Sequence, residues 1–447
     1  MDIPDKYDHQ KRVVIVGAGF AGLTLAKKLA AKYFQVILID KNNYHQFQPL
    51  LYQVATSGLE PSSISFPLRK IFQKKRNVVI RMTNVTAISP ETKTVHTEIG
   101  DLEYDYLVLA HGATTNFYNN DRLQQNAYSM KSVSEALLLR NSLLQNYELA
   151  LNAKNEEHRS SLLNVVIVGG GPTGVELAGA IAEMKMKILP KDYGELNFRH
   201  MHIHLLEAAP RLLNGMSAKS GERIINYLQK LGVEVHPNAA VKDYDGETVL
   251  LSDGKKIHTH CLIWAAGVKG VAIPGIPESA VAGNKRLFVN KYNKVKDLQD
   301  VYAIGDIALM QDEVWQKGHP QVAQVAIQQA LLLAKNLEKI QTGKGLNSFK
   351  YKDKGSMATV GRNLALAEIG RIKLKGFVAW FVWMLVHLMS IIGVKNRLFI
   401  LINWMWLYIT YDQSLRLIIK PTFKNNDLKL YEESSGNLKV NKLLAGV

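Results

Sequence analysis

Two stretches of the chain share one pattern of apolar and polar positions. Each begins with a four-residue run of valine and isoleucine, passes through a glycine-rich joint and continues as an alanine- and leucine-rich segment: VVIVGAGFAGLTLAKKLA at 13–30 and VVIVGGGPTGVELAGAIA at 165–182. The apolar run predicts a buried parallel strand, and the segment after it predicts a helix. The copies start 152 positions apart, so the chain contains an internal duplication of one strand–helix unit.

Both joints place glycines at GxGxxG spacing between the strand and the helix. In the first copy Gly17 permits a tight turn, Gly19 lets the backbone approach a pyrophosphate, and Gly22 lets helix and strand pack closely. The free N–H groups and partial positive charge at the start of the helix favour phosphate. Each copy is therefore predicted to bind a dinucleotide. The second copy repeats the set with Gly169, Gly171 and Gly174.

A second predicted strand ends in a carboxylate in each copy. QVILID ends at Asp40, with Lys41 directly after it as a further cofactor-binding candidate, and HIHLLE ends at Glu207. A carboxylate at this place accepts hydrogen bonds from ribose hydroxyls and disfavours a 2′-phosphate, so NADH is expected over NADPH at the second site. Glu207 follows its glycines at a longer distance than usual, because about fifteen extra residues intervene. We interpret residues 184–200 as a helix extension plus a loop.

The stretch VYAIGDIA at 301–308 predicts a third strand that leads into a turn. Gly305 and Asp306 then place a backbone N–H and a carboxylate at a helix start, which suits the ribityl chain of a flavin. Two dinucleotide folds in one chain imply one tightly held nucleotide and one that exchanges. We therefore expect tightly but non-covalently bound FAD in the first copy and NADH, as substrate, in the second.

The predicted fold class is α/β, with two Rossmann-like dinucleotide-binding domains and a C-terminal α-helical region that associates with a membrane. The predicted limits are 1–120 with 266–345 for the FAD-binding domain, 121–265 for the NADH-binding domain and 346–447 for the C-terminal region, which serves membrane association or dimerisation.

Composition narrows the class of protein. With 47% hydrophobic and 21% charged residues over 447 positions, the chain is not collagen-like, a coiled coil or disordered. The single cysteine, Cys261, excludes a disulfide framework, and its apolar neighbours predict a small core residue. No HExxH or paired CxxC spacing occurs, and His202 and His204 alternate in a predicted strand as ordinary strand residues, so no metal site is predicted. The N-terminal residues lack the apolar stretch of a secretory signal.

Much of the net charge of +16 lies near the C-terminus. Residues 370–424 contain eight lysines and arginines against one aspartate. This charge is interleaved with two apolar segments, 376–394 and 398–411, rather than with a polar groove, so nucleic-acid binding is disfavoured. A helix over the first segment would span about 28 Å, enough to cross a bilayer. Because Trp380 and Trp383 lie along it rather than at its ends, we predict two helices in the membrane surface, with a dimer interface as the alternative.

These motifs resemble those of the two-dinucleotide-binding flavoproteins and, among them, the type II NADH dehydrogenases, which are single-chain NADH:quinone oxidoreductases. Besides both glycine motifs and AIGD, the resemblance includes FQPLLYQVATSGLEP (47–61), AQVAIQQA (323–330) and KGSMATVGR (354–362), whereas His111 departs from the small or hydroxyl residue usual in the family. The resemblance implies a glutathione-reductase-like fold, a homodimer and monotopic attachment to the cytoplasmic face of a bacterial inner membrane.

The resemblance also implies roles for three side chains. Glu176, in the first turn of the second predicted helix, matches a glutamate that orients NADH; the alternative is a carboxylate that complements the helix dipole. Gln324 and Gln328, at i and i+4 on one helix face, match a pair that hydrogen-bonds the quinone; the alternative is two solvent-facing glutamines.

Electrons are then expected to pass from NADH through the flavin to membrane ubiquinone or menaquinone, because Cys261 has no second cysteine with which to form a thiol relay. Two alternatives remain at this point: a soluble flavin or ferredoxin-type reductase, and a non-catalytic protein that senses NADH. Neither needs an apolar, basic C-terminal region, and this region therefore favours the quinone reductase.

Overall fold

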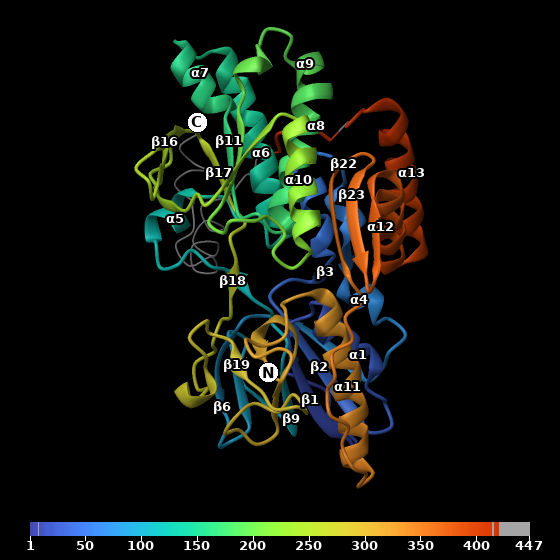
Figure 1. Cartoon of the computed structure of the whole chain (residues 1–447). Coiled ribbons are helices and arrows are strands. Elements are labelled where there is room, and N and C mark those ends of the chain that lie inside the picture. The colour runs from blue at the N-terminus through green and yellow to red at the C-terminus, as the bar shows by residue number, and fades with distance from the viewer. Residues whose placement is uncertain (8, 414, 420–447) are drawn as a thin grey trace. The chain divides into compact units, whose positions relative to one another are not determined.

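The computed structural model in Figure 1 describes residues 1–7, 9–413 and 415–419. The chain forms two compact units. The first comprises residues 1–47, 65–114 and 268–354, and the second comprises residues 48–64, 115–267 and the chain from 355 onward. The sequence predicts an FAD-binding domain, an NADH-binding domain and a C-terminal region. The limits of these three regions stay predictions.

The first unit is built on a five-stranded parallel sheet in the order β20-β9-β1-β2-β5. The central strand is the valine and isoleucine run of the first repeat, and Val13, Val14 and Ile15 are fully buried because the strand is covered on both faces. Helices α1 (Phe20–Lys28) and α11 (Ala323–Gln341) pack against each other in this unit. The strands are β1 (Lys11–Val16), β2 (Phe34–Asp40), β5 (Val78–Met82), β9 (Tyr106–Leu109) and β20 (Val301–Ala303).

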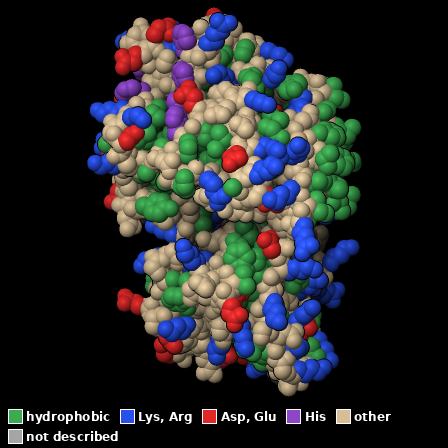
Figure 2. Space-filling view, in the orientation of Figure 1, with side chains coloured by type: hydrophobic (Ala, Val, Ile, Leu, Met, Phe, Trp, Pro, Cys, Tyr) green, Lys and Arg blue, Asp and Glu red, His purple; other side chains and the backbone are tan. Residues whose placement is uncertain are grey.

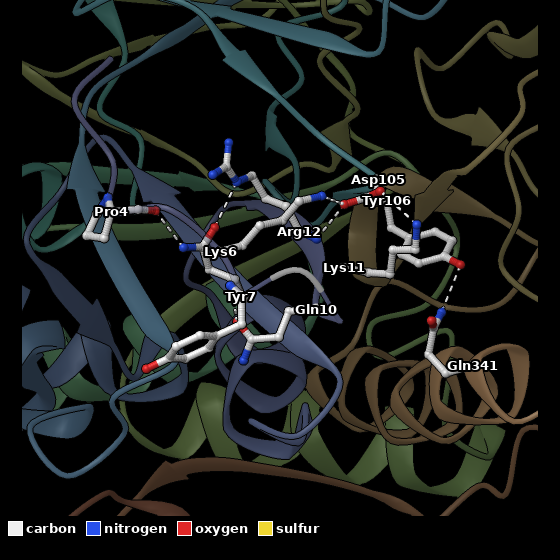
Figure 3. Close-up of polar contacts among 10 residues, drawn as sticks. Pro4, Lys6, Tyr7, Gln10, Lys11, Arg12, Asp105, Tyr106 and Gln341 are labelled. Atoms are coloured by element: carbon white, nitrogen blue, oxygen red, sulfur yellow. Dashed lines mark hydrogen bonds and ion pairs between the residues drawn. The ribbon is translucent and has the colours of Figure 1, made fainter.

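An ion-paired carboxylate ties the N-terminal segment to this sheet. Asp105, which precedes β9, accepts a hydrogen bond from the backbone N–H of Arg12 in β1 at 2.7 Å and pairs with Lys6 at 2.6 Å and Lys11 at 3.3 Å (Figure 3). Burial alone would raise the pKa of Asp105, but the hydrogen bonds from Lys6 and Arg12 lower it overall. The charged carboxylate therefore anchors β1, which leads into the first glycine turn.

The remaining elements of the first unit are short. An antiparallel sheet contains β6 (Val85–Ser89), β7 (Thr94–Thr97) and β8 (Leu102–Glu103). Two pairs of short strands are β3 (Tyr44–Gln46) with β4 (Ser65–Pro67) and β19 (Leu287–Phe288) with β21 (Ala308–Leu309). The others are α4 (Leu68–Ile71), η3 (Glu278–Ala280) and η4 (Gly305–Ile307), and β10 (Thr114–Thr115) and β18 (Val268–Lys269) lie at the limits of the units.

The second unit repeats the architecture with a four-stranded parallel sheet in the order β13-β12-β11-β17. Its strands are β11 (Val165–Val168), β12 (Ile203–Glu207), β13 (Val233–Pro237) and β17 (Cys261–Trp264). Cys261 is fully buried, which confirms its prediction as a core residue. The segment between glycine turn and carboxylate is, as predicted, a helix extension plus a loop: α8 (Pro172–Lys187) is followed by α9 (Leu189–Asp192) and η2 (Phe198–His200).

Further helices and a small sheet complete this part of the second unit. Helix α6 begins with a capping box in which Ser132 and Glu135 satisfy each other's backbone N–H groups. The helices are η1 (Gln48–Leu50), α2 (Leu51–Ala55), α3 (Pro61–Ile64), α5 (Asp121–Asn126), α6 (Val133–Leu151), α7 (Glu156–Leu163) and α10 (Ala218–Lys230). The antiparallel sheet contains β14 (Val241–Tyr244), β15 (Thr248–Leu251) and β16 (Lys256–His258).

The C-terminal region begins with a sheet before it becomes helical. Strands β22 (Ser356–Gly361), β23 (Leu364–Ile369) and β24 (Ile372–Lys375) are antiparallel and precede α12 (Gly376–Ser390) and α13 (Val394–Thr410). Neither apolar segment keeps its predicted limits, because the chain turns at Gly393, where φ is +85°. Among the described residues, no helix has the length and hydropathy needed to span a bilayer. Lys420 and Lys424 of the basic region lie outside the described residues.

Candidate active site

The first glycine turn joins β1 to α1 and has the geometry of a dinucleotide-binding turn. Gly17 has a φ of +101°, and a Cβ there would lie 2.5 Å from the carbonyl oxygen of Ala110. A Cβ on Gly22 would overlap the carbonyl oxygen of Gly17. Around Gly19, by contrast, no atom of the described chain lies within 4 Å of the Cβ position. The first and third glycines are therefore required by packing, and the second leaves the space that a pyrophosphate needs.

The second glycine turn, from β11 to α8, has the same construction. Gly169 has a φ of +113°, and its Cβ would lie 2.6 Å from the carbonyl oxygen of Ala265. A Cβ on Gly174 would overlap the carbonyl oxygen of Gly169, whereas the described residues leave the space beside Gly171 open. Both turns thus provide an open N-terminal helix end for phosphate.

Asp40 lies at the C-terminal end of β2, beside the first turn. Its carboxylate accepts hydrogen bonds from the backbone N–H groups of Ala18 at 2.6 Å and Asn42 at 2.7 Å. Burial raises the pKa of Asp40, while these two N–H groups and the charge of the exposed Lys41 oppose the rise. The carboxylate is thus held in one orientation at the edge of the turn.

Glu207 occupies the corresponding place at the end of β12. It accepts hydrogen bonds from the backbone N–H groups of Gly170 at 2.6 Å and Ala209 at 2.7 Å. These bonds repeat those of Asp40, one to the glycine turn and one two residues further along the chain. The inserted residues 184–200 therefore leave the position of the carboxylate unchanged.

The AIGD motif forms the turn expected from the sequence. Gly305 begins η4 with a φ of +76°, and its N–H donates to Oε1 of Gln329 at 2.7 Å. The carbonyl of Asp306 accepts from Gln321 at 3.0 Å. In the same unit, Nδ1 of His111 is buried and has no hydrogen-bond partner among the described residues. An open glycine turn and an orphaned buried nitrogen in one unit fit a polar nucleotide cofactor such as FAD.

Gln324 and Gln328 share one face of α11, as predicted. Their amides bind a neighbouring stretch of backbone. Gln328 makes two hydrogen bonds to Lys352, at 2.9 and 3.0 Å, and Gln324 accepts from the N–H of Lys354 at 2.9 Å. Both glutamines therefore hold residues 352–354, and because both side chains are only partly buried, their predicted role at the quinone stays a prediction.

Glu176 lies in a pocket within the second unit rather than at a helix end. Helix α8 begins at Pro172, a residue suited to the first helical position, so the prediction that Glu176 occupies the first turn is wrong. The side chain is buried beside β22 and α12. Six of the nineteen residues that line the pocket are aromatic: Tyr52, Trp380, Trp383, Trp404, Tyr408 and Tyr411.

The burial of Glu176 controls its protonation. Burial raises the pKa of Glu176 to about 8, although the backbone of Thr359 and the indole of Trp383 favour the charged form. The carboxyl group is therefore mostly protonated at neutral pH. Nearby, Tyr52 is also buried, and both burial and the charge of Glu176 raise its pKa. Glu183, a second carboxyl group of the pocket, also has a pKa raised by burial, which the backbone N–H of Arg362 opposes.

Segments distant in sequence close this pocket. Asn403 donates to the carbonyl oxygen of Gly58 at 2.8 Å, and the indole of Trp404 donates to Gln53 at 2.8 Å. The guanidinium of Arg362 lies 3.5 Å from the ring centroid of Tyr411. Sequence reasoning did not single out Gln53 or Arg362, although the family-like segments 47–61 and 354–362 contain them.

Two dinucleotide turns of the same construction, each with its own carboxylate, define a pyridine-nucleotide-dependent flavoprotein oxidoreductase. Residues 11–330 match the pyridine nucleotide-disulphide oxidoreductase family. Over 412 residues the chain is 38% identical to the type II NADH:quinone oxidoreductase Ndh of Mycobacterium tuberculosis, with 88% of this chain and 87% of the relative covered. The paralogue NdhA is 34% identical, with 90% and 88% covered.

A solved structure shows the same fold. The structure of NDH2 from Plasmodium falciparum in complex with NADH has a TM-score of 0.84 and 23% identity, and it covers 92% of this chain and 100% of that one. The chain belongs to the type II NADH:quinone oxidoreductases. It is therefore an oxidoreductase enzyme that depends on FAD and uses NADH, and the resemblance and fold class predicted from the sequence are confirmed.

Proposed function

We propose that this chain transfers electrons from NADH to a membrane quinone without pumping protons, with FAD held by the first unit and NADH by the second. The proposal rests on the two matched glycine turns. In each turn the second glycine leaves open space, and a carboxylate that accepts a hydrogen bond from the turn lies beside it. FAD, when bound, accepts a hydride from the nicotinamide and supplies two electrons to the quinone. The protein supplies positioning, charge and protons.

The two carboxylates are proposed to select the nucleotides. Asp40 accepts hydrogen bonds from the ribose of the FAD adenosine, and Lys41 lies next to it in solvent. Glu207 does the same for NADH and repels the 2′-phosphate of NADPH. Gly305 and Asp306 hold the ribityl chain of the flavin. The backbone hydrogen bonds that fix both carboxylates support these roles, because a preorganised acceptor loses little freedom when the ribose binds.

The aromatic pocket of the second unit is proposed to take the quinone. A quinone head is flat and apolar and has two carbonyl oxygens, and aromatic side chains beside a buried proton donor match this chemistry. Glu176 would then hold a proton at its carboxyl group for a quinone oxygen. Its burial within this pocket supports this role. Gln324 and Gln328 hold residues 352–354 in place through their side-chain amides. An amide that binds a quinone oxygen would give up one of these hydrogen bonds.

The exposed faces of α12 and α13 are proposed to lie in the membrane surface. One face of α12 is apolar and solvent-exposed: the side chains of Val378, Phe381, Leu385 and Met389 are 49–58% exposed, whereas Trp383 is buried. Figure 2 shows this apolar patch over the two helices. An apolar patch beside the exposed lysines at 373, 375 and 395 suits an anionic lipid surface.

Charges on this face should weaken membrane binding. We expect the double variant Phe381→Glu, Leu385→Glu to bind anionic phosphatidylglycerol vesicles at least 10-fold more weakly, since each substitution removes an apolar side chain worth about 1.5–3 kcal/mol of burial. The measurement is co-sedimentation with vesicles. Met82→Glu with Val314→Glu, which changes two exposed apolar side chains of the first unit, is the control. Equal losses in both double variants would contradict the assignment.

A homodimer through the same face, and location at the cytoplasmic side of a bacterial inner membrane, complete the proposal. A second copy would cover α12 and α13 in the same way as lipid. Sedimentation in detergent distinguishes a dimer contact from a lipid contact. If the parent chain stays dimeric in detergent and the Phe381→Glu, Leu385→Glu variant is monomeric, the dimer interface lies on α12 and α13. The two uses of the face are compatible, since two copies can share part of it.

An anaerobic optical titration tests the proposed reaction. NADH should bleach the absorbance of the bound flavin, and a soluble quinone added afterwards should restore it. NADPH serves as the matched control and should bleach far more slowly, because Glu207 opposes its 2′-phosphate. Restoration by a ferredoxin but not by the quinone would support the soluble reductase instead, and a folded, colourless chain that takes up no FAD would contradict the proposal.

A further inference from the structure

Two neighbouring strands of the second unit carry a cluster of metal-ligating side chains on one face. His204 lies on β12, and Glu234 and His236 lie on β13, with His204 paired to Glu234 in the strand register. Because side chains two positions apart on a strand point to the same side, His202 joins them. Figure 2 shows histidine side chains gathered on this unit, near α7 and β16 as labelled in Figure 1.

The donor atoms of three of these side chains are spaced as ligands of one ion. Nδ1 of His204 lies 3.3 Å from Nε2 of His236 and 3.3 Å from Oε2 of Glu234, and the third edge is 4.0 Å. A tetrahedral ion with bonds of about 2.0–2.1 Å holds its ligand atoms about 3.3 Å apart. Two of the three distances already match this value. The longest distance joins His236 and Glu234, whose side chains are 40% and 44% exposed and can therefore move closer together.

His202 fixes the orientation of the carboxylate. Its Nδ1 lies 2.6 Å from Oε1 of Glu234, which leaves Oε2 directed to His204. A side chain that holds the outer oxygen of a ligating carboxylate is the usual outer partner of a metal site. The three inner ligands come from the sheet, and the solvent side leaves a fourth position for water.

We propose that His204, Glu234 and His236 bind one borderline divalent cation, with Zn²⁺ as the representative ion, and that His202 acts as the outer partner. Imidazole and carboxylate ligands together suit Zn²⁺ better than the hard cations Mg²⁺ and Ca²⁺, which prefer oxygen alone. The ion would join β12 to β13, and β12 is the strand that ends at Glu207. This departs from the interpretation of His202 and His204 as ordinary strand residues, and it does not depend on the proposed reaction.

The test is a Zn²⁺ titration of the full-length, FAD-bound chain, prepared without a histidine tag, in competition with a chromophoric chelator. We expect one equivalent of Zn²⁺ to bind. His236→Gln should weaken binding more than 100-fold, and loss of the outer partner in His202→Ala should weaken it about 10-fold. His200→Ala is the matched control, because this exposed histidine of η2 pairs with Glu156 instead, and it should leave the affinity unchanged.

A second readout separates binding to the folded cluster from non-specific uptake. Zn²⁺ should raise the melting temperature of the parent chain, since an ion bound only by the folded state stabilises it, and should not raise that of His236→Gln. The side chain of His236 is 40% exposed, so this variant keeps its fold even where a change at the more buried His204 does not. Equal Zn²⁺ affinities for the parent and His236→Gln, or an equal loss in His200→Ala, would overturn the proposal.

Discussion

Gly171→Ala should raise the KM for NADH by roughly 100-fold and leave the fold and flavin content unchanged. The backbone at Gly171, with φ −74° and ψ 177°, suits alanine, and the described residues leave room for its methyl group. That methyl group would instead occupy the space in which the pyrophosphate approaches the helix end. Gly19→Ala is the equivalent change in the first unit, and it should remove FAD and with it all activity.

Flavin absorbance per mole of protein and steady-state kinetics check this pair of variants. Gly194→Ala, an exposed glycine of the second unit whose Cβ position is open among the described residues, serves as the control and should change neither quantity. Loss of flavin in Gly171→Ala together with a changed KM for NADH in Gly19→Ala would reverse the assignment of the two nucleotides. Unaltered constants in both variants would refute dinucleotide binding at these turns.

Glu176→Gln should lower the rate of quinone reduction at pH 7 by roughly 100-fold, because a positioned proton donor contributes about 10²–10⁴-fold. Reduction of the flavin by NADH should be unaffected. In the parent chain the rate should fall as the pH rises through about 8, where Glu176 loses its proton. The variant has no such ionisation, so this part of its pH profile should be flat. Stopped-flow measurement of the two half-reactions separates these effects.

The same ionisation predicts a stability difference. Folding raises the pKa of Glu176 from its ordinary value to about 8, so its stabilising contribution is complete in acid and is lost as the pH rises through about 8. The melting temperature of the parent should therefore fall relative to that of Glu176→Gln as the pH rises from 4.5 to about 8, and the difference should stay constant above that pH. Glu183→Gln is the control for the pH dependence of the rate. Glu183 is a neighbouring buried carboxyl that accepts from the backbone N–H of Arg362, and its substitution should leave the pH–rate profile of the parent unchanged. A change in the KM for NADH alone would favour the NADH-orienting role of Glu176.

The nucleotide turns could be predicted because their chemistry is local. Gly17, Gly19 and Gly22 lie within six residues, and a buried strand with a glycine turn has few other uses. Asp40 follows from the same pattern, since the carboxyl end of a parallel strand lies beside the turn of its neighbour. Glu207 was reached despite the residues inserted before it, because an insertion between a helix and a strand lengthens a loop without shifting the strand.

The aromatic pocket could not be predicted, because three distant parts of the chain form it. Residues 52–53, 359–362 and 380–411 meet around Glu176 only after the second unit has folded. The sequence placed Glu176 in the first turn of a helix, and its burial in a pocket formed by distant segments could not be seen there. The histidine cluster could not be predicted for a similar reason. The motifs HIH and EVH are 32 positions apart, and only the register of β12 with β13 shows that they lie side by side.

The division of the chain into units has a consequence for biosynthesis. Neither unit is a continuous stretch of polypeptide: the first is complete only when residue 354 has been made, and the second includes the last described helix. Strand β20 joins β9 in the first sheet although about 190 residues separate them. A chain that stops before residue 354 should therefore leave neither unit able to fold, so the protein is expected to depend on chaperones while it is being translated.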